Sequence, residues 1–247
     1  MVDIIVKHNR FFHCRIIDPI SNSTWFATFV YVYPDKSLQF DFWNELTSLK
    51  PSSNDPWIIM GNFNNVTCTE EKSGGSNPSS TYMHNFIHFL NSINVCSLPA
   101  EGLPFTWSNK HSDQSLIFEL LDRVVANPHW LNLFPFATLE NLLISGSDHG
   151  PIVLTILPVR VIKTYSLKFE AIWQSHPEFP NLVKKFWSQT LDSNPIKNFK
   201  PISNAFCFHL SHWSKEQFGN FRNKYSTLEN DLAFYQLQFM NNPNSDF

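Results

Sequence analysis

The sequence predicts an α+β fold followed by a helical extension. Up to about residue 158, short runs rich in β-branched and aromatic residues alternate with helical stretches and with Pro, Ser, Asn and Gly. From about residue 165 onwards the pattern is helical. Hydrophobic residues make up 43% of the 247 residues, which is enough for a packed core. We therefore expect two domains, residues 1–158 and residues 165–247.

The predicted strands are short runs of β-branched and aromatic residues that end in turn-forming residues. In the first quarter of the chain they are DIIV, FFHCRII, TWFATFVYVY (residues 24–33) and PWIIMG. Further along come the short pieces CSLPA, PFTWSN, LLDRVVAN and TLENLLI, and then the run GPIVLTIL (residues 150–157). The last of these has the continuous apolar pattern of a buried strand.

Two helices are expected between these strands, because apolar residues recur there at helical spacing. The first covers residues 38–49, and the second starts at a capping Ser80 or Thr81 and runs to about Asn94. The apolar faces are Phe40, Phe42, Trp43, Leu46 and Leu49 in the first helix, and Met83, Phe86, Ile87, Leu90 and Ile93 in the second. In the helical extension, Leu228, Leu232, Tyr235 and Phe239 recur at helical spacing, which indicates an arm that needs a partner surface.

Composition and charge narrow the class of protein. The net charge is −3, so the chain has no overall basic character that would favour nucleic acid, although a local basic groove is compatible with this value. Its four cysteines are far apart without a CxxC pair, which predicts buried free thiols and a reducing compartment. No apolar run approaches the about 20 residues of a membrane span, and the N-terminus is too polar for a signal peptide. We expect an intracellular protein of the nucleus or cytoplasm, with no membrane partner.

Polar residues gather at three strand ends and suggest one convergent site. They are Asn62 with Asn64, Asp122 with Arg123, and Ser147-Asp148-His149. Asp122 could accept a hydrogen bond from His149 and fix its tautomer, so that His149 acts as a general acid or base or stabilises charge on a phosphate oxygen. Asn64 could donate to the same phosphate. Asp148 could hold a metal or its water shell, because Mg²⁺ prefers oxygen ligands.

Two other polar patterns have ordinary structural explanations. His84 and His88 lie four residues apart on a helix, but they lack the third ligand that a zinc site needs. Lys215, Arg222 and Lys224 could touch nucleic acid, but a solvated helix face is the default interpretation.

The order and spacing of five motifs resemble a known superfamily. The motifs are GNFN, EKSGG, GLPFTWSN, LLDRVVANPHW and SDHGPI. Together they resemble the endonuclease/exonuclease/phosphatase superfamily, and above all the endonuclease domain of plant LINE-type (non-LTR) retrotransposons. The helical part, including KFEAIWQSHPEF and HLSHWSKEQFGN, is similar to the linker before reverse transcriptase in those polyproteins. This resemblance implies a metal-dependent phosphodiesterase on a two-sheet β-sandwich flanked by helices, with Mg²⁺ as cofactor and DNA as partner.

The resemblance assigns roles to individual residues. His149 matches the catalytic histidine, Asp148 the acidic residue beside it, and Asp122 the aspartate that orients the histidine. Asn64 matches the asparagine that contacts the scissile phosphate, and Tyr31 matches, in a looser alignment, a tyrosine on the phosphate side. The strand on the substrate side is matched by Phe105, Thr106 and Trp107.

The sequence departs from the superfamily pattern at two places. The motif is Gly-Asp-Phe-Asn, and here Asn62 stands at the aspartate position, which helps to activate the attacking water. An amide cannot take up the proton and is a poor ligand for a hard cation. The superfamily also opens with a strand carrying an Asn and a second strand ending in a metal-binding Glu. This chain begins after both, so we expect a β-sandwich that is incomplete at the N-terminus.

These departures predict a catalytically inactive remnant of a DNA endonuclease domain from a retrotransposon polyprotein. Two alternatives stay open. One is a residual Mg²⁺-dependent nuclease, and the other is a non-catalytic module that binds nucleic acid or protein. No small-molecule cofactor is expected, and the sequence gives no oligomeric state.

Overall fold

The computed structural model describes residues 1–18, 23–52, 54–111, 115–156, 169–188 and 193–241, without the side chains of residues 195 and 220–223. The chain divides into two compact units, Met1–Val159 with Leu232–Phe247, and Arg160–Asp231. The boundary expected between residues 158 and 165 lies outside the described residues, so the two-domain division stays a prediction.

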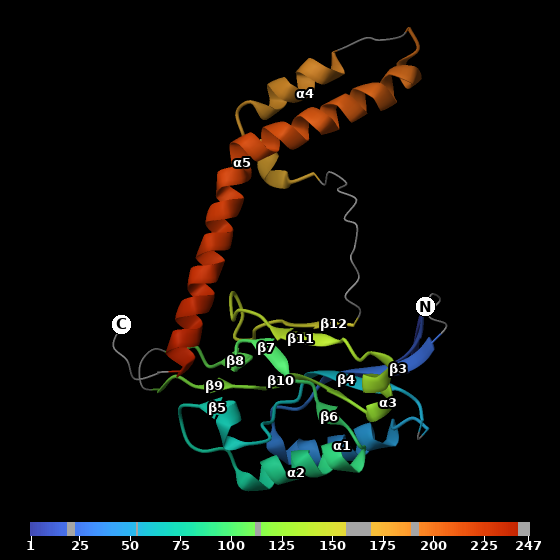
Figure 1. Cartoon of the computed structure of the whole chain (residues 1–247), viewed down its shortest axis with the longest axis vertical. Coiled ribbons are helices and arrows are strands. Elements are labelled where there is room, and N and C mark those ends of the chain that lie inside the picture. Colours follow the sequence, from blue (N-terminus) through green and yellow to red (C-terminus); the bar gives the residue numbers. More distant parts are fainter. Residues whose placement is uncertain (19–22, 53, 112–114, 157–168, 189–192, 242–247) are drawn as a thin grey trace. The chain divides into compact units, whose positions relative to one another are not determined.

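A six-stranded sheet forms the centre of the first unit (Figure 1). In spatial order its strands are β1 (Val2–Lys7), β2 (Phe11–Asp18), β3 (Ser23–Tyr31), β4 (Trp57–Asn62), β10 (Asp122–Ala126) and β6 (Cys96–Ser97). Neighbouring strands are antiparallel except β3 and β4, which run parallel. Parallel neighbours need a crossover connection. Here the crossover contains the short 3-10 helix η1 (Lys36–Leu38) and helix α1 (Gln39–Ser48).

Side chains alternate between the two faces of this sheet, as strand geometry requires. In β4, Trp57 and Ile59 pack into the core on the helix side, whereas Ile58 packs into the core on the opposite side. Continuing the alternation puts Asn62 on the same face as Ile58. The same rule puts Asp122, the first residue of β10, on the face of Val124, which belongs to that second core.

Two short sheets complete the first unit. One consists of β12 (Ile152–Thr155), β11 (Thr138–Asn141) and β7 (Ala100–Gly102), and the other of β5 (Lys72–Ser73), β9 (Phe118–Glu119) and β8 (Trp107–Ser108). The first of them shares a core with the six-stranded sheet and with α3 (Pro128–Leu133), built around Trp25, Trp130 and Leu139. The predicted α+β fold with sheets flanked by helices is therefore confirmed, and one of the short sheets packs against the main sheet. Leu157, the last residue of the expected strand 150–157, lies outside the described residues.

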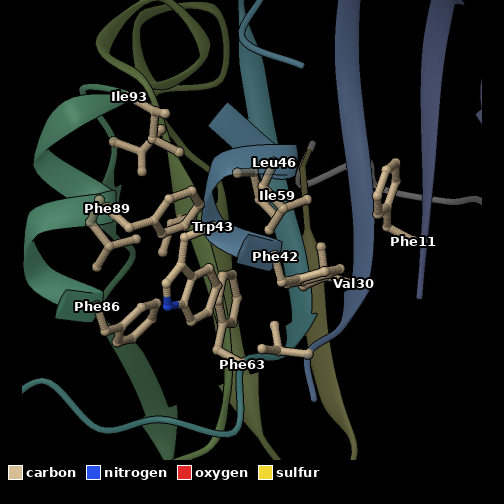
Figure 2. Packing of buried hydrophobic residues seen from close by; sticks show 14 of the residues in the cluster. Phe11, Val30, Phe42, Trp43, Leu46, Ile59, Phe63, Phe86, Phe89 and Ile93 are labelled. Carbon is tan, nitrogen blue, oxygen red and sulfur yellow. The ribbon is translucent and has the colours of Figure 1, made fainter. Parts of the chain in front are cut away.

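Two helices cover the other face of the main sheet (Figure 1). They are α1 and α2 (Ser80–Ser92), and aromatic rings fill the space between them and the strands. Figure 2 shows this core, in which Trp43 stacks on Phe89 at 4.6 Å and on Phe86 at 5.3 Å between ring centroids. Ring area of this kind supplies much of the stabilisation of a core.

The structure corrects the expected apolar face of α1. Phe40 is 63% exposed, and the buried residues are Gln39, Phe42, Trp43 and Leu46. These four follow the i, i+3, i+4, i+7 spacing of one helix face, and Phe40 falls outside that stripe. The Nε2 amide of Gln39 donates to the Tyr33 carbonyl at 2.7 Å, which explains a polar residue in this position.

The N-terminus of α2 also differs from expectation. The capping position is Ser79, one residue before the expected Ser80, and its side chain makes no capping hydrogen bond.

The second unit is helical, as the sequence pattern indicates. It contains η4 (Ala171–Ser175), α4 (Phe179–Trp187) and most of α5 (Pro195–Asn241), around a core of Trp173, Leu210 and Trp213. The end of α5 belongs to the first unit, where Phe239 and Met240 pack near Phe118. Among the described residues, none of the helices is long and apolar enough to cross a membrane.

The cysteines only partly follow the expectation of buried free thiols. All four are free, but only Cys14 is buried, while Cys68, Cys96 and Cys207 are exposed.

Candidate active site

Three of the expected site residues lie in one row across the main sheet. The strand register pairs Tyr31 of β3 with Asn62 of β4, and Asn62 with Asp122 of β10. Residues paired in register project from the same face of a sheet. The row lies at one end of β3, β4 and β10, beside the core that these strands share with the short sheet that contains β11. These polar side chains therefore lie at the edge of that core. Asn62 is 8% exposed and Tyr31 is 49% exposed.

His149 reaches this row from the loop between β11 and β12. Its backbone forms an isolated antiparallel bridge with Trp107, and the next residue, Gly150, donates its N–H to the Thr106 carbonyl at 2.8 Å. The imidazole Nδ1 of His149 lies 2.7 Å from Oδ2 of Asp122. This is the contact expected from the sequence, and the catalytic roles of the two residues stay predictions.

The hydroxyl of Thr106 fixes the start of β10. Its Oγ1 accepts hydrogen bonds from the backbone N–H of Asp122 at 2.9 Å and of Leu121 at 3.1 Å. Thr106 is only 1% exposed. It therefore holds the backbone that carries Asp122, and its side chain is not open to a substrate.

The hydrogen bond to Asp122 raises the pKa of His149, and this effect outweighs burial, which acts in the opposite direction. The negative charges of Asp122 and Asp148 add to the increase. At a given pH, a larger fraction of His149 is therefore in the imidazolium form than of an isolated histidine. A positive charge at the end of the sheet is suited to an anionic oxygen.

Asn62 faces His149 with the NH₂ group of its side-chain amide, which cannot accept a proton. Its Nδ2 lies 3.5 Å from Nε2 of His149, and its Oδ1 accepts the backbone N–H of Asn64 at 2.7 Å. A neutral His149 protonated on Nδ1 can donate to Asp122 and accept from Asn62. If His149 is an imidazolium, its Nε2 is also a hydrogen-bond donor, and it then faces the donor Nδ2 of Asn62 without an acceptor between them. Asn62 therefore opposes the protonated state that Asp122 supports.

Asn64 has a structural role in this geometry. Its φ angle is +48°, and its Nδ2 donates to the Val32 carbonyl at 2.7 Å. Asparagine tolerates this left-handed conformation better than most residues. The Asn64 carbonyl accepts from the Lys36 ammonium of η1, and the Asn64 backbone N–H donates to Asn62 at the end of β4. A contact from Asn64 to phosphate stays a prediction.

Asp148 is exposed and is held by its neighbours. Its Oδ2 accepts from Nε1 of Trp107 at 3.1 Å, and its Oδ1 accepts from the Ser147 hydroxyl at 3.2 Å. The hydrogen bond from Trp107 is the main reason that the pKa of Asp148 is lowered. The carboxylate is ionised at neutral pH, with both oxygens engaged.

These residues do not fit a magnesium ion. Mg²⁺ requires octahedral oxygen ligands, commonly including one or two carboxylates. Here Asn62 presents an amide, Asp122 is bound to His149, and Asp148 is bound to Trp107 and Ser147. Within the described part of the chain, no group of three or more His, Cys, Asp and Glu side chains could hold a metal ion. No reaction step through a metal follows from this arrangement.

The other residues expected on the substrate side differ in accessibility. Phe105 is buried and its ring stacks near Phe118, with 6.0 Å between centroids. Trp107 is partly exposed and contacts Asp148. Tyr31 faces solvent, and the guanidinium of Arg10 lies 5.0 Å from its ring centroid. Arg10 was not anticipated, because nothing in the sequence indicates that the turn between β1 and β2 reaches Tyr31.

Replacing Asp122 with Asn should lower the pKa of His149 towards or below that of a free histidine, because the charged acceptor is lost. Since the pKa of His149 is raised in the folded chain, its stabilising contribution is present below the unfolded pKa of about 6.5 and is lost as pH rises through the folded value. The variant should therefore be less stable than the original chain by about 1 kcal/mol at mildly acidic pH. The deficit should shrink at alkaline pH. NMR titration of the histidine ring protons, with His149→Gln to assign the signal, and urea unfolding at both pH values measure these effects. An unchanged His149 titration would contradict the interaction.

Comparison with known proteins gives fold similarity alone. The sequence matches no protein-family model and no curated protein sequence. Among solved structures, the chain is similar to the endonuclease domain of TRAS1, a telomere-specific non-LTR retrotransposon, with 16% identity and a TM-score of 0.49. That match covers 63% of this chain and 68% of the TRAS1 domain.

Two further solved structures have the same kind of similarity. An endonuclease/exonuclease/phosphatase family protein from Leptotrichia buccalis C-1013-b has 14% identity and a TM-score of 0.37, over 60% of this chain and 52% of that one. The mannosyl-6-phosphatase Bt3783 of Bacteroides thetaiotaomicron has 11% identity and a TM-score of 0.39, over 63% and 67%. The chain thus spans about half the length of the Leptotrichia protein.

Proposed function

We propose that this chain is the catalytically inactive remnant of a DNA endonuclease domain, derived from a plant LINE-type retrotransposon polyprotein. The observation that carries the proposal is the Asn62 amide, which lies 3.5 Å from His149 at the position where the resembling proteins have an aspartate. The remaining pair of His149 and Asp122 supports a phosphodiesterase ancestry, and the order of the sequence motifs supports the retrotransposon origin. Free cysteines are in keeping with a nuclear or cytoplasmic location.

The residues can bind a phosphodiester but lack a group to activate water. His149, charged with the help of Asp122, can donate from Nε2 to a phosphate oxygen. An attacking water must lose a proton, and Asn62 has no basic atom to accept it. Loss of a positioned general base typically lowers a rate by about 10²–10⁴-fold. We therefore expect the site to leave DNA uncleaved.

Plasmid nicking tests the proposal directly. We expect no nicking by the purified chain with either Mg²⁺ or Mn²⁺, because the amide cannot take up the proton. Nicking by Asn62→Asp, which places a carboxylate at this position, would show that the amide alone accounts for the inactivity. Adding His149→Ala to Asn62→Asp should abolish that nicking. Circular dichroism of each variant establishes that the fold is retained.

The outcome that contradicts inactivity is specific. If the unaltered chain nicks plasmid and His149→Ala does not, this is a residual nuclease, a second candidate favoured by the 2.7 Å contact between His149 and Asp122. If Asn62→Asp folds and still does not nick plasmid, the amide is not the sole reason for inactivity. Salt-dependent DNA binding in the absence of cleavage would support a non-catalytic binding module.

A further inference from the structure

A cavity whose lining does not include His149 lies between η1, β5 and the start of α2. Its volume is about 350 Å³, which is within the range of ligand pockets. The charged and hydroxyl-bearing residues of its lining are Lys36, Lys72, Glu119, Ser76, Ser79 and Tyr82. Val66, Pro78 and Met83 also line the cavity, so the charged and hydroxyl groups are the ones that could recognise a polar ligand.

Lys36 brings a partly buried positive charge to this cavity. Its ammonium donates to the Asn64 carbonyl and, at 3.0 Å, to Oδ1 of Asn65. An ammonium has three donors, so these two bonds leave one for a ligand. Burial lowers the pKa of Lys36, the Glu119 carboxylate offsets part of this decrease, and the charge of Lys72 adds to it. An anion in the cavity would relieve the cost of burying this charge.

Lys72 adds a second positive charge, which is shared with a carboxylate. Its Nζ lies 2.8 Å from Oε1 of Glu119, and both side chains are largely buried. The three ionised groups, Lys36, Lys72 and Glu119, leave an excess of one positive charge. Removing the Glu119 charge would increase this excess.

The N-terminus of α2 also adds positive potential at the cavity. The helix is 13 residues long, has no acidic residue in its first turn, and is not capped by the Ser79 side chain. The first N–H groups of a helix have no partner within the helix, and the helix dipole makes this end positive. Ser79 and the three residues before it line the cavity, so this end of α2 borders the space that Lys36 and Lys72 enclose.

We propose that this cavity binds a phosphate group. Two lysines, a helix N-terminus without a side-chain cap, and the hydroxyl-bearing Ser76 and Tyr82 line one cavity. Each of them favours an anionic ligand with several acceptor oxygens, and phosphate has that chemistry. The proposal does not depend on the function proposed above, because inorganic phosphate alone is sufficient to test it.

Calorimetric titration of the full chain with inorganic phosphate tests the site with two substitutions of opposite effect. Ser79→Asp places a carboxylate at the capping position, where it stabilises the helix but repels an anion, so phosphate affinity should fall about two- to fivefold. Glu119→Gln removes the competing carboxylate, so affinity should rise by a similar factor. Glu101→Gln makes the same change at an exposed position and should have no effect. Thermal unfolding of Ser79→Asp shows whether the variant is as stable as the unaltered chain, so that weaker phosphate binding is not caused by unfolding.

Absence of phosphate binding in both the unaltered chain and Glu119→Gln would overturn the proposal. Binding that none of the substitutions changes would also overturn it, because the phosphate would then be held elsewhere. A competition experiment with a short DNA oligonucleotide identifies the source of the group. If the oligonucleotide displaces phosphate and Ser79→Asp weakens that displacement, the cavity accepts a phosphate of a nucleic acid strand. If it does not compete, the cavity is a site for free phosphate.

Discussion

Replacing Arg123 with Met should destabilise the first unit by about 3–5 kcal/mol, because it leaves a carboxylate buried without its partner. Arg123 is 4% exposed, and its guanidinium donates to both carboxylate oxygens of Glu71, at 3.0 and 2.7 Å. It also donates to the Leu120 carbonyl at 2.8 Å and lies over the Phe86 ring. Urea unfolding of the purified variant at neutral pH measures the loss.

The pH dependence of this loss distinguishes a charge effect from lost packing. Burial alone would raise the pKa of Glu71, but the hydrogen bond and charge of Arg123, with the hydrogen bonds from Thr67, lower it overall. The pair therefore stabilises the fold above the unfolded pKa of about 4.3, and this contribution is lost as pH falls through the folded value. Without Arg123, burial should raise the Glu71 pKa, so the deficit should narrow on acidification.

A double substitution provides the control. Arg123→Met combined with Glu71→Gln should recover part of the stability, because no ionised group is then left buried. If the double variant is as unstable as Arg123→Met alone at neutral pH, the unpaired charge is not the cause.

Replacing Gly61 with Ala should cost at least about 3 kcal/mol, because β4 approaches β3 too closely there for a side chain. Gly61 has a φ angle of +140°, and a Cβ at this position would lie 2.1 Å from the Val30 carbonyl oxygen. The obstacle is backbone, so relief requires moving β3 against β4. Gly61 directly precedes Asn62, so the shift should also disturb the contact between Asn62 and His149. The change in unfolding free energy and the His149 ring signals report both effects.

Gly146→Ala is the matched control for this substitution. Gly146 also has a positive φ, +71°, but a Cβ added there would have no other atom within 4 Å. Only the backbone conformation is then penalised, at about 1–2 kcal/mol. Equal losses from the two substitutions would show that the close approach of Gly61 to Val30 is unimportant.

Local sequence pattern was sufficient for most elements of the fold. The run Trp57 to Met60 combines large apolar side chains with an abrupt change to Gly61, which predicts both a buried strand and its end. The helix α2 followed from apolar spacing in the same way. Apolar spacing was not sufficient for Phe40, because the buried face of α1 includes the polar Gln39, whose amide bonds to the Tyr33 carbonyl, and leaves Phe40 outside.

Residue chemistry in the sequence indicated the candidate site, but it could not assign accessibility. His149 and Asp122 stood out because they belong to two of the three polar clusters expected at strand ends, and their side chains lie in contact. Phe105 and Thr106 belong to the same motif as Trp107, yet only Trp107 is partly exposed. Which side of a short strand faces the interior depends on the sheet packed against it, and no local pattern carries that information.

Residue type and neighbours along the chain were enough to predict most of the strands and helices and to show an amide, Asn62, directly after the buried run of β4. Only the tertiary structure decided that Tyr31, Asn62 and Asp122 form one row, since that row depends on the register of three strands distant in sequence. The cavity at Lys36 and Lys72 arises in the same way. It exists because the crossover after β3, the strand β5 and the start of α2 meet in space.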